Sequence, residues 1–267
     1  MNTLHLLLLA IVQGITEFLP VSSSGHLILL PQLLGVEDQG LMLDVAVHVG
    51  TLGAVMLYFW RDMAKLIIGL GHVVTGRFST PQARLFLLLS FATIPVVIAG
   101  LALKQTGTME ALRSMKVIGW TMLIFGIALY VADRKGPEAK QAAAWSWKDA
   151  LLMGLAQAIA LIPGTSRSGI TITAARALGY TRTESARLSM LMSVPTIMAS
   201  GLLLGVDVAK AGDWSLLKEA SIAAALAFFA ALLALTLMMR LLKSTSFTPY
   251  VLYRIALGIL LLWFAYS

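Results

Sequence analysis

The chain has 267 residues, of which 58% are hydrophobic and 12% are charged. Ordinary globular chains carry about 25% charged residues, so this composition excludes a soluble fold and indicates a membrane protein. The net charge of +7 reflects basic residues in short loops between apolar runs, which lipid headgroups explain without a nucleic-acid partner.

The first apolar region, residues 4–35, is too interrupted to form one spanning helix. Glu17, three consecutive serines and His26 divide it into two arms, and each arm is shorter than the ~20 residues that cross a bilayer. Non-helical backbone at membrane depth is tolerated only where it is buried in protein or faces water. We therefore predict a re-entrant helical hairpin with a Ser-rich tip.

Apolar stretches of near-spanning length follow, and a second interrupted region lies among them. Residues 149–179 contain Pro163, Gly164 and Arg167 and predict a second re-entrant hairpin. Membrane spans are predicted at 41–60, 85–103, 117–132, 188–206, 220–239 and 251–266. The sequence thus predicts an all-α polytopic membrane protein with a single integral membrane domain over residues 1–267.

The two interrupted regions resemble one another at an offset of 144 residues (157 − 13). The matching pairs are Gln13 and Gln157, Ser22 and Ser166, Ser24 and Ser168, and Gly25 and Gly169. We interpret them as an internal duplication, with repeat one over 1–132 and repeat two over 149–267. Because three spans separate the hairpins, the repeats are expected to be inverted, with tips that can meet near the bilayer midplane.

Lysines and arginines gather in the 61–84, 133–148 and 180–187 loops. The positive-inside rule assigns these loops to the cytoplasm. The 104–116 and 207–219 loops are more mixed in sign and are expected outside. Both termini and the opening of the first hairpin then lie on the outer side.

The second tip, residues 163–171, has the composition of a phosphate cradle. Arg167 offers a planar fork suited to phosphate oxygens. Backbone amides approach an anion most closely at glycines, and a helix that restarts after Gly169 would direct its N-terminal amides to the same place. The predicted phosphate-binding residues of this tip are Gly164, Ser166, Ser168, Gly169 and Thr171.

The first tip carries Glu17 and His26 instead of an arginine, which favours a reactive role. An ionisable residue at membrane depth marks function by default. Its serines could serve only as helix caps, and Asp44 and His48 are interpreted first as a polar pair on one helix face. The sequence contains no G-x-x-x-x-G-K-[ST] motif, so a nucleotide P-loop is excluded.

With these motifs in view, the chain resembles the undecaprenyl-diphosphate phosphatases of the bacitracin-resistance (BacA/UppP) type. The resemblance covers nearly the whole length and rests on Gln13-x-x-x-Glu17, on Pro-Val-Ser-Ser-Ser-Gly-His at 20–26, and on Pro-Gly-Thr-Ser-Arg-Ser-Gly-Ile-Thr at 163–171. It implies an enzyme of the bacterial inner membrane that removes the terminal phosphate of undecaprenyl diphosphate on the outer side. The product recycles the lipid carrier for cell-wall synthesis, and bacitracin competes for the lipid without binding the protein.

The resemblance also implies roles for individual residues. Glu17, Ser23, His26 and Arg167 are the expected catalytic residues, and Ser22, Ser24 and Gly25 are expected to join the phosphate-binding set. Ser23 is the expected nucleophile, with His26 as its base or as proton donor to the leaving phosphate; the rival is direct attack by His26. A divalent cation, Mg²⁺ or Ca²⁺, is expected at Glu17, with Gln13 as a second ligand candidate, although many family members carry Glu at that position.

Two questions stay open at the level of sequence. Inverted repeats with midplane loops are also transporter architecture, so a lipid-phosphate flippase or transporter is the alternative function. A homodimer is compatible with the sequence, which does not determine the oligomeric state.

Overall fold

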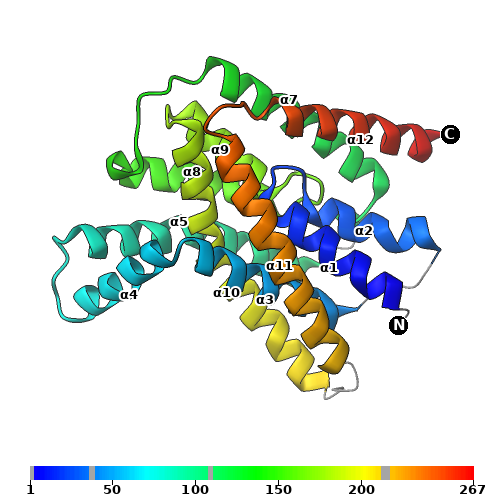
Figure 1. The fold of residues 1–267 in the computed structure, drawn as a ribbon, viewed down its shortest axis with the longest axis horizontal. Helices are drawn as coiled ribbons and strands as arrows, with labels where there is room; N and C mark the ends of the chain where they lie inside the picture. The colour runs from blue at the N-terminus through cyan, green and yellow to red at the C-terminus, as the bar shows by residue number, and fades with distance from the viewer. Residues whose placement is uncertain (1–2, 36–39, 108–110, 212–216) are drawn as a thin grey trace.

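The computed structural model describes residues 3–35, 40–107, 111–211 and 217–267, and the regular elements in these ranges are helices. Six of them are long and apolar enough to cross a membrane. They are α3 (Leu41–Tyr58), α5 (Pro81–Thr106), α7 (Met115–Lys135), α10 (Arg182–Ala211), α11 (Leu217–Leu241) and α12 (Thr248–Tyr266). The six predicted spans are therefore confirmed as helices, in an all-α fold (Figure 1).

Each interrupted region forms two short helices joined by a turn. The first comprises α1 (Thr3–Phe18) and α2 (Ser23–Leu34), and the second comprises α8 (Trp147–Ile159) and α9 (Arg167–Ala177). At 1.5 Å per residue even α1 extends only about 24 Å, which is less than the ~30 Å hydrocarbon core. The expected helical arms are thus present on both sides of each Ser-rich tip.

The loop predicted over 61–84 is largely helical instead. Helix α4 (Trp60–Val74) precedes a short connection to α5, and a single 3₁₀ turn, η1 (Ala142–Ala144), lies before α8. Asp62, Met63 and Gly69 form the buried side of α4, and Gly69 allows the backbone of α5 to approach closely at Gln82. Helix α4 was not predicted from the sequence, because the charged residues of this segment make it too polar to match the pattern of a membrane span.

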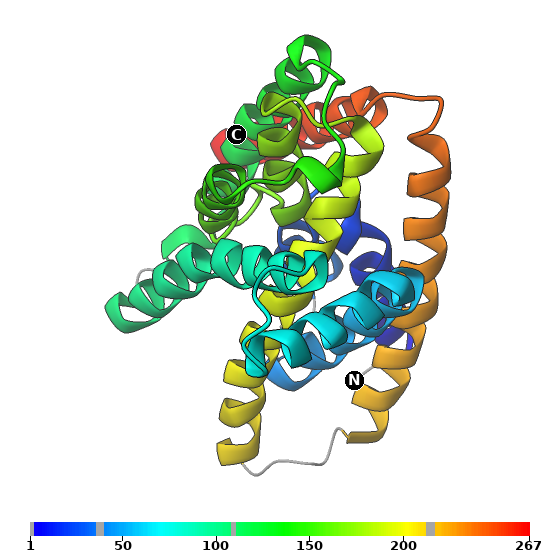
Figure 2. The same cartoon turned by 90° about the vertical axis from the view of Figure 1, so that its left-hand side faces the viewer.

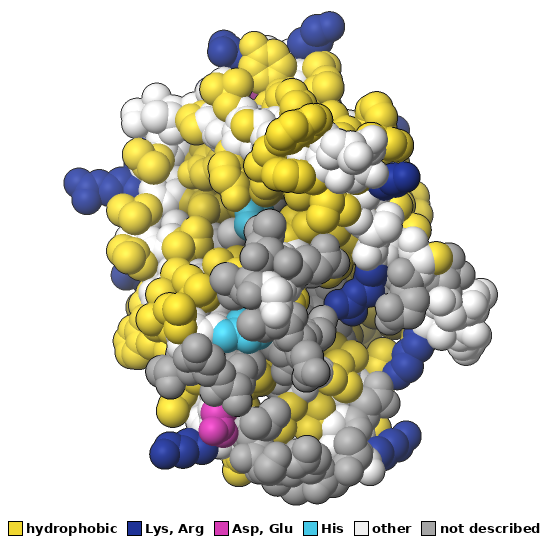
Figure 3. Space-filling model, turned by 90° about the vertical axis from the view of Figure 1, so that its right-hand side faces the viewer, with side chains coloured by type: hydrophobic (Ala, Val, Ile, Leu, Met, Phe, Trp, Pro, Cys, Tyr) yellow, Lys and Arg dark blue, Asp and Glu magenta, His cyan; other side chains and the backbone are white. Residues whose placement is uncertain are grey.

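The first helix of each short helical pair packs against one of the long apolar helices. Helix α1 packs against α11, α8 packs against α5, and α7 packs against α12 (Figures 1 and 2). At the first contact a Cβ on Gly14 would overlap α11, and at the second a Cβ on Gly154 would overlap the backbone of α5. Small residues permit such close helix approach in membranes. Hydrophobic side chains cover much of the outer face seen in Figure 3, as expected for lipid-facing helices.

Candidate active site

The turns between α1 and α2 and between α8 and α9 share an unusual backbone conformation. Ser22 has φ 74° and Ser166 has φ 70°, and they are the two non-glycine residues with positive φ in the described ranges. Each serine caps the helix that follows: Ser22 Oγ accepts from Gly25 N, and Ser166 Oγ accepts from Gly169 N. A non-glycine residue in this conformation costs of order 1–3 kcal/mol and persists mainly at functional sites.

The two turns are in direct contact, as the sequence predicted. Ser168 Oγ donates to Leu19 O across 3.0 Å. Arg167 Nη2 lies 2.9 Å from Glu17 Oε1 and forms an ion pair with it. Helix α9 begins at Arg167, three residues earlier than the start after Gly169 that the sequence suggested, so Arg167 belongs to its first turn.

Glu17 is the centre of the site. Its Oε2 accepts from Ser23 Oγ at 2.7 Å and from Gln13 Nε2 at 3.0 Å. His48 Nε2 lies 3.9 Å from the same oxygen, so His48 lies beside the site. Its Nδ1 lies 2.7 Å from the backbone carbonyl of Asp44, and the polar pair of these two side chains stays a prediction. Glu17 is only 7% exposed, and Arg167 neutralises its charge in this low-dielectric setting.

Both ring nitrogens of His26 have hydrogen-bond partners other than Ser23. Its Nδ1 lies 2.7 Å from Ser22 O, and its Nε2 lies 2.6 Å from the hydroxyl of Tyr253, whose ring stacks on the imidazole at 5.7 Å between centroids. Because a carbonyl only accepts, Nδ1 carries the proton in the neutral ring and Nε2 accepts from Tyr253. The hydrogen-bond partner of Ser23 is therefore Glu17, where the sequence had suggested His26.

Replacing Tyr253 by phenylalanine is expected to lower kcat by about three- to tenfold, since it removes one hydrogen bond that orients His26 and leaves the ring stacking intact. Steady-state rates across pH would check this, because losing the donor at Nε2 should also raise the imidazole's affinity for a proton. An unchanged rate and pH profile would show that Tyr253 does not act through His26.

The predicted phosphate-binding hydroxyls of the second turn are engaged inside the protein. Ser166 and Ser168 are bonded to one another at 3.2 Å, and Thr171 Oγ1 lies 2.6 Å from Ser189 Oγ on α10. All three are almost fully buried. Ser23, Ser24 and Arg167 retain exposed surface at the site, and phosphate binding by the buried hydroxyls stays a prediction.

Glycines in and beside the turns allow close backbone approach. Gly164 has φ 86°, and a Cβ there would overlap Thr121 and the backbone of α7 at Ile118. A Cβ on Gly169 would meet the guanidinium of Arg254, whereas one on Gly25 would lie 3.3 Å from Ile118. These contacts explain the glycines by packing, and amide contacts with an anion stay a prediction.

One residue that joins both turns was not predicted from the sequence. Arg254 on α12 is fully buried and donates to Pro20 O of the first turn and to Gly164 O and Thr165 O of the second. It also donates to two carbonyls of α7, at Thr121 and Met122. The available signal was an arginine inside the 251–266 span, since a charge at that depth is costly unless it is bonded.

The chain was compared with known proteins. The family model described as bacitracin resistance protein BacA matches residues 6–260. Proteins named undecaprenyl-diphosphatase from Ruegeria pomeroyi and Dinoroseobacter shibae are 65% and 64% identical to it, over 100% of both chains in each comparison. A protein of the same name from Erythrobacter litoralis is 44% identical over 99% of this chain and 100% of its own length. The chain therefore belongs to the BacA family of bacitracin resistance proteins.

Proposed function

We propose that this protein hydrolyses undecaprenyl diphosphate to undecaprenyl phosphate and inorganic phosphate. Full-length relatives at 65% and 64% identity are named for this activity. The observation that carries the proposal is the contact between the turns, where a hydroxyl, a carboxylate and a guanidinium meet in Ser23, Glu17 and Arg167. Transport would need no nucleophile held by a base, and nothing in the relatives' names favours it.

Ser23 is the nucleophile in this mechanism. Its Oγ attacks the terminal phosphorus while its proton passes to Glu17 Oε2, 2.7 Å away. The bridging P–O bond breaks, and undecaprenyl phosphate leaves. Arg167 neutralises the charge on the transferred phosphoryl group, which is the main task of a protein in this chemistry.

His26 acts as the general acid for the leaving group. In its protonated form it gives a proton to the departing phosphate oxygen, and it then takes a proton from the water that attacks the phosphoserine. Glu17 returns its proton to Ser23 Oγ as inorganic phosphate leaves. Direct attack by His26 is the alternative. Ser23 is preferred as the nucleophile because its hydroxyl is bonded to the carboxylate of Glu17, which can accept its proton.

Ser23→Ala is expected to lower kcat by at least about a thousandfold, because the variant has no hydroxyl to form the phosphoserine. Phosphate release by purified protein would measure the rate, and Ser221→Ala, which removes an exposed hydroxyl bonded within α11, is the matched control. Full turnover by the Ser23 variant would rule out Ser23 as the nucleophile.

The residues around Glu17 suit a divalent cation. Gln13 Oε1 is buried and has no hydrogen-bond partner in the described part of the chain, and amide and carboxylate oxygens are ligands that Mg²⁺ and Ca²⁺ prefer. No group of three or more His, Asp or Glu side chains could hold a metal in the described ranges, so substrate phosphate oxygens would complete the coordination. Bound by Glu17 and Gln13, the cation would offset phosphate charge.

The proposed topology is a pair of inverted repeats, each with a re-entrant hairpin, in the bacterial inner membrane. The matched turn geometry at Ser22 and Ser166 supports it, as does the full burial of Gln13 and Gln157. The site would open to the outer side, where the enzyme would recycle the lipid carrier for cell-wall synthesis and so confer bacitracin resistance.

The deciding experiment is phosphate release from a C55 diphosphate by the pure protein in detergent with Mg²⁺ or Ca²⁺. The proposal expects turnover by the wild type and by Arg134→Ala, which removes a surface arginine stacked on Tyr130. It expects near-complete loss in Arg167→Ala and His26→Ala. Absence of release by the wild type would reject the hydrolase.

A further inference from the structure

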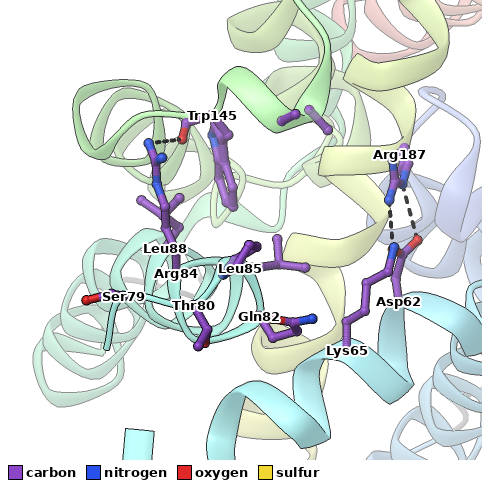
Figure 4. A pocket seen from close by; sticks show the side chains of 13 residues that line it. Asp62, Lys65, Ser79, Thr80, Gln82, Arg84, Leu85, Leu88, Trp145 and Arg187 are labelled. Atoms are coloured by element: carbon purple, nitrogen blue, oxygen red, sulfur yellow. Dashed lines mark hydrogen bonds and ion pairs between the residues drawn. The ribbon is translucent and has the colours of Figure 1, made fainter. Parts of the chain in front are cut away.

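A cavity of about 620 Å³ lies between α4, the start of α5, η1 and α10 (Figure 4). Its volume falls in the range of small-molecule sites, about 300–1,000 Å³. None of the residues assigned above to the two turns lines it. It is therefore a separate feature of the molecule with its own chemistry.

The lining of this cavity is positively charged. Lys65, Arg84 and Arg187 contribute three positive charges, and Asp62 contributes one negative charge, which leaves a net charge of +2 among the lining residues (3 − 1). Asp62 is shared by two of these cations: Lys65 Nζ lies 3.2 Å from it, and Arg187 Nη2 lies 2.7 Å from it. Glu184, outside the lining, lies 3.3 Å from Arg187 and reduces the local charge to +1.

Arg84 supplies the excess charge. Its Nη2 donates to the carbonyl of Trp145 at 3.2 Å, which is a neutral acceptor. Figure 4 shows Arg84 and Trp145 on one side of the cavity and the Asp62–Arg187 pair on the other, with Leu85 between them. An occupant would thus meet the excess charge of Arg84 at one end, the acid-paired cations Lys65 and Arg187 at the other, and apolar side chains in the middle, as an anion with a short apolar portion requires.

The cavity also lies beside a lipid-facing helix. Ile67 and Val74 of α4 are 73% and 77% exposed, and with 15 residues α4 is too short to span a bilayer. A short helix with an apolar outer face and basic residues suits the membrane interface. The cavity next to it then lies at the depth of phospholipid headgroups, on the side that the positive-inside rule assigns to the cytoplasm.

We propose that this cavity binds the phosphate headgroup of an anionic phospholipid such as phosphatidylglycerol, with the start of the acyl region against Leu85, Leu88 and Trp145. Basic pockets between membrane helices on the cytoplasmic side bind anionic headgroups in this way. A choline headgroup would place a further cation in a site that is already positive. Free inorganic phosphate shares the anionic group but leaves the apolar walls uncovered.

Native mass spectrometry of the full-length protein tests the proposal, with phosphatidylglycerol and phosphatidylcholine added to separate samples. In the double variant Lys65→Gln/Arg84→Gln both altered side chains are exposed, and the Asp62–Arg187 pair is kept. The matched control Arg61→Gln/Arg77→Gln removes the same charge around α4 from residues that do not line the cavity. We expect the first pair to weaken phosphatidylglycerol binding about tenfold or more, and the control pair to leave it within about twofold of the wild type.

Three results would overturn the assignment. The first is equal phosphatidylglycerol binding by the wild type and by Lys65→Gln/Arg84→Gln, when thermal unfolding curves show that both proteins are folded. The second is binding of phosphatidylcholine by the wild type as tight as its binding of phosphatidylglycerol. The third is displacement of the lipid by millimolar inorganic phosphate, which would assign the site to a free anion. Because the readout is binding, it does not depend on the phosphatase activity.

Discussion

Glu17→Gln is expected to lower kcat by about a thousandfold or more, with a smaller change in KM. The carboxylate is the acceptor for the Ser23 proton, and general base catalysis contributes about 10²–10⁴ in rate. The glutamine keeps the size of the side chain and the hydrogen bond from Gln13, but its amide cannot act as the base that takes the Ser23 proton. Steady-state phosphate release at saturating and limiting lipid would separate kcat from KM.

The loss of kcat in Glu17→Gln could also arise from displacement of Arg167, and this explanation can be tested separately. Arg167 loses its ion-pair partner in this variant, but its side chain is 14% exposed, so water moderates the cost. Glu184→Gln is the control, because it neutralises a carboxylate that is likewise paired with an arginine, Arg187, outside the site. Glu17→Gln activity above about a tenth of the wild type, in protein with unchanged thermal unfolding, would contradict a base role.

The features that the sequence predicted correctly depend on local composition. The 85–103 stretch is apolar over spanning length, and it reappears inside α5. The turns followed from clusters of Pro, Gly and Ser in apolar surroundings, because several such residues in succession favour a turn over a continuous helix. Contact between the tips followed from the repeat and the parity of the spans.

The features that it could not predict depend on distant parts of the chain. The choice of Glu17 over His26 as the partner of Ser23 depends on the path of the first turn, to which Arg254 donates at Pro20 O. Tyr253 reaches His26 from 227 residues away. Helix α4 was hidden for another reason, since its charged residues are paired in three dimensions, as Asp62 is with Arg187.

Arg254→Met is expected to reduce both stability and turnover, with a loss of about 3 kcal/mol or more in the free energy of unfolding. The change leaves five carbonyl oxygens without their charged donor, three of them in the catalytic turns. The turns would then shift relative to one another. Displacements near 1 Å between catalytic groups can cost about a hundredfold in rate, so kcat should fall at least that far in the folded fraction.

Arg254→Lys separates the charge from the geometry. Lysine keeps the positive charge, but its ammonium has three donors on a flexible stem and cannot reproduce the planar fork that reaches two turns and α7 at once. We expect Arg254→Lys to recover part of the thermal stability that Arg254→Met loses. We expect it to recover little of the lost kcat. Recovery of both to wild-type values would show that Arg254 acts through its charge alone. Unchanged kcat in folded Arg254→Met would show that the turns hold their geometry without it, through Ser168 and the Glu17–Arg167 pair.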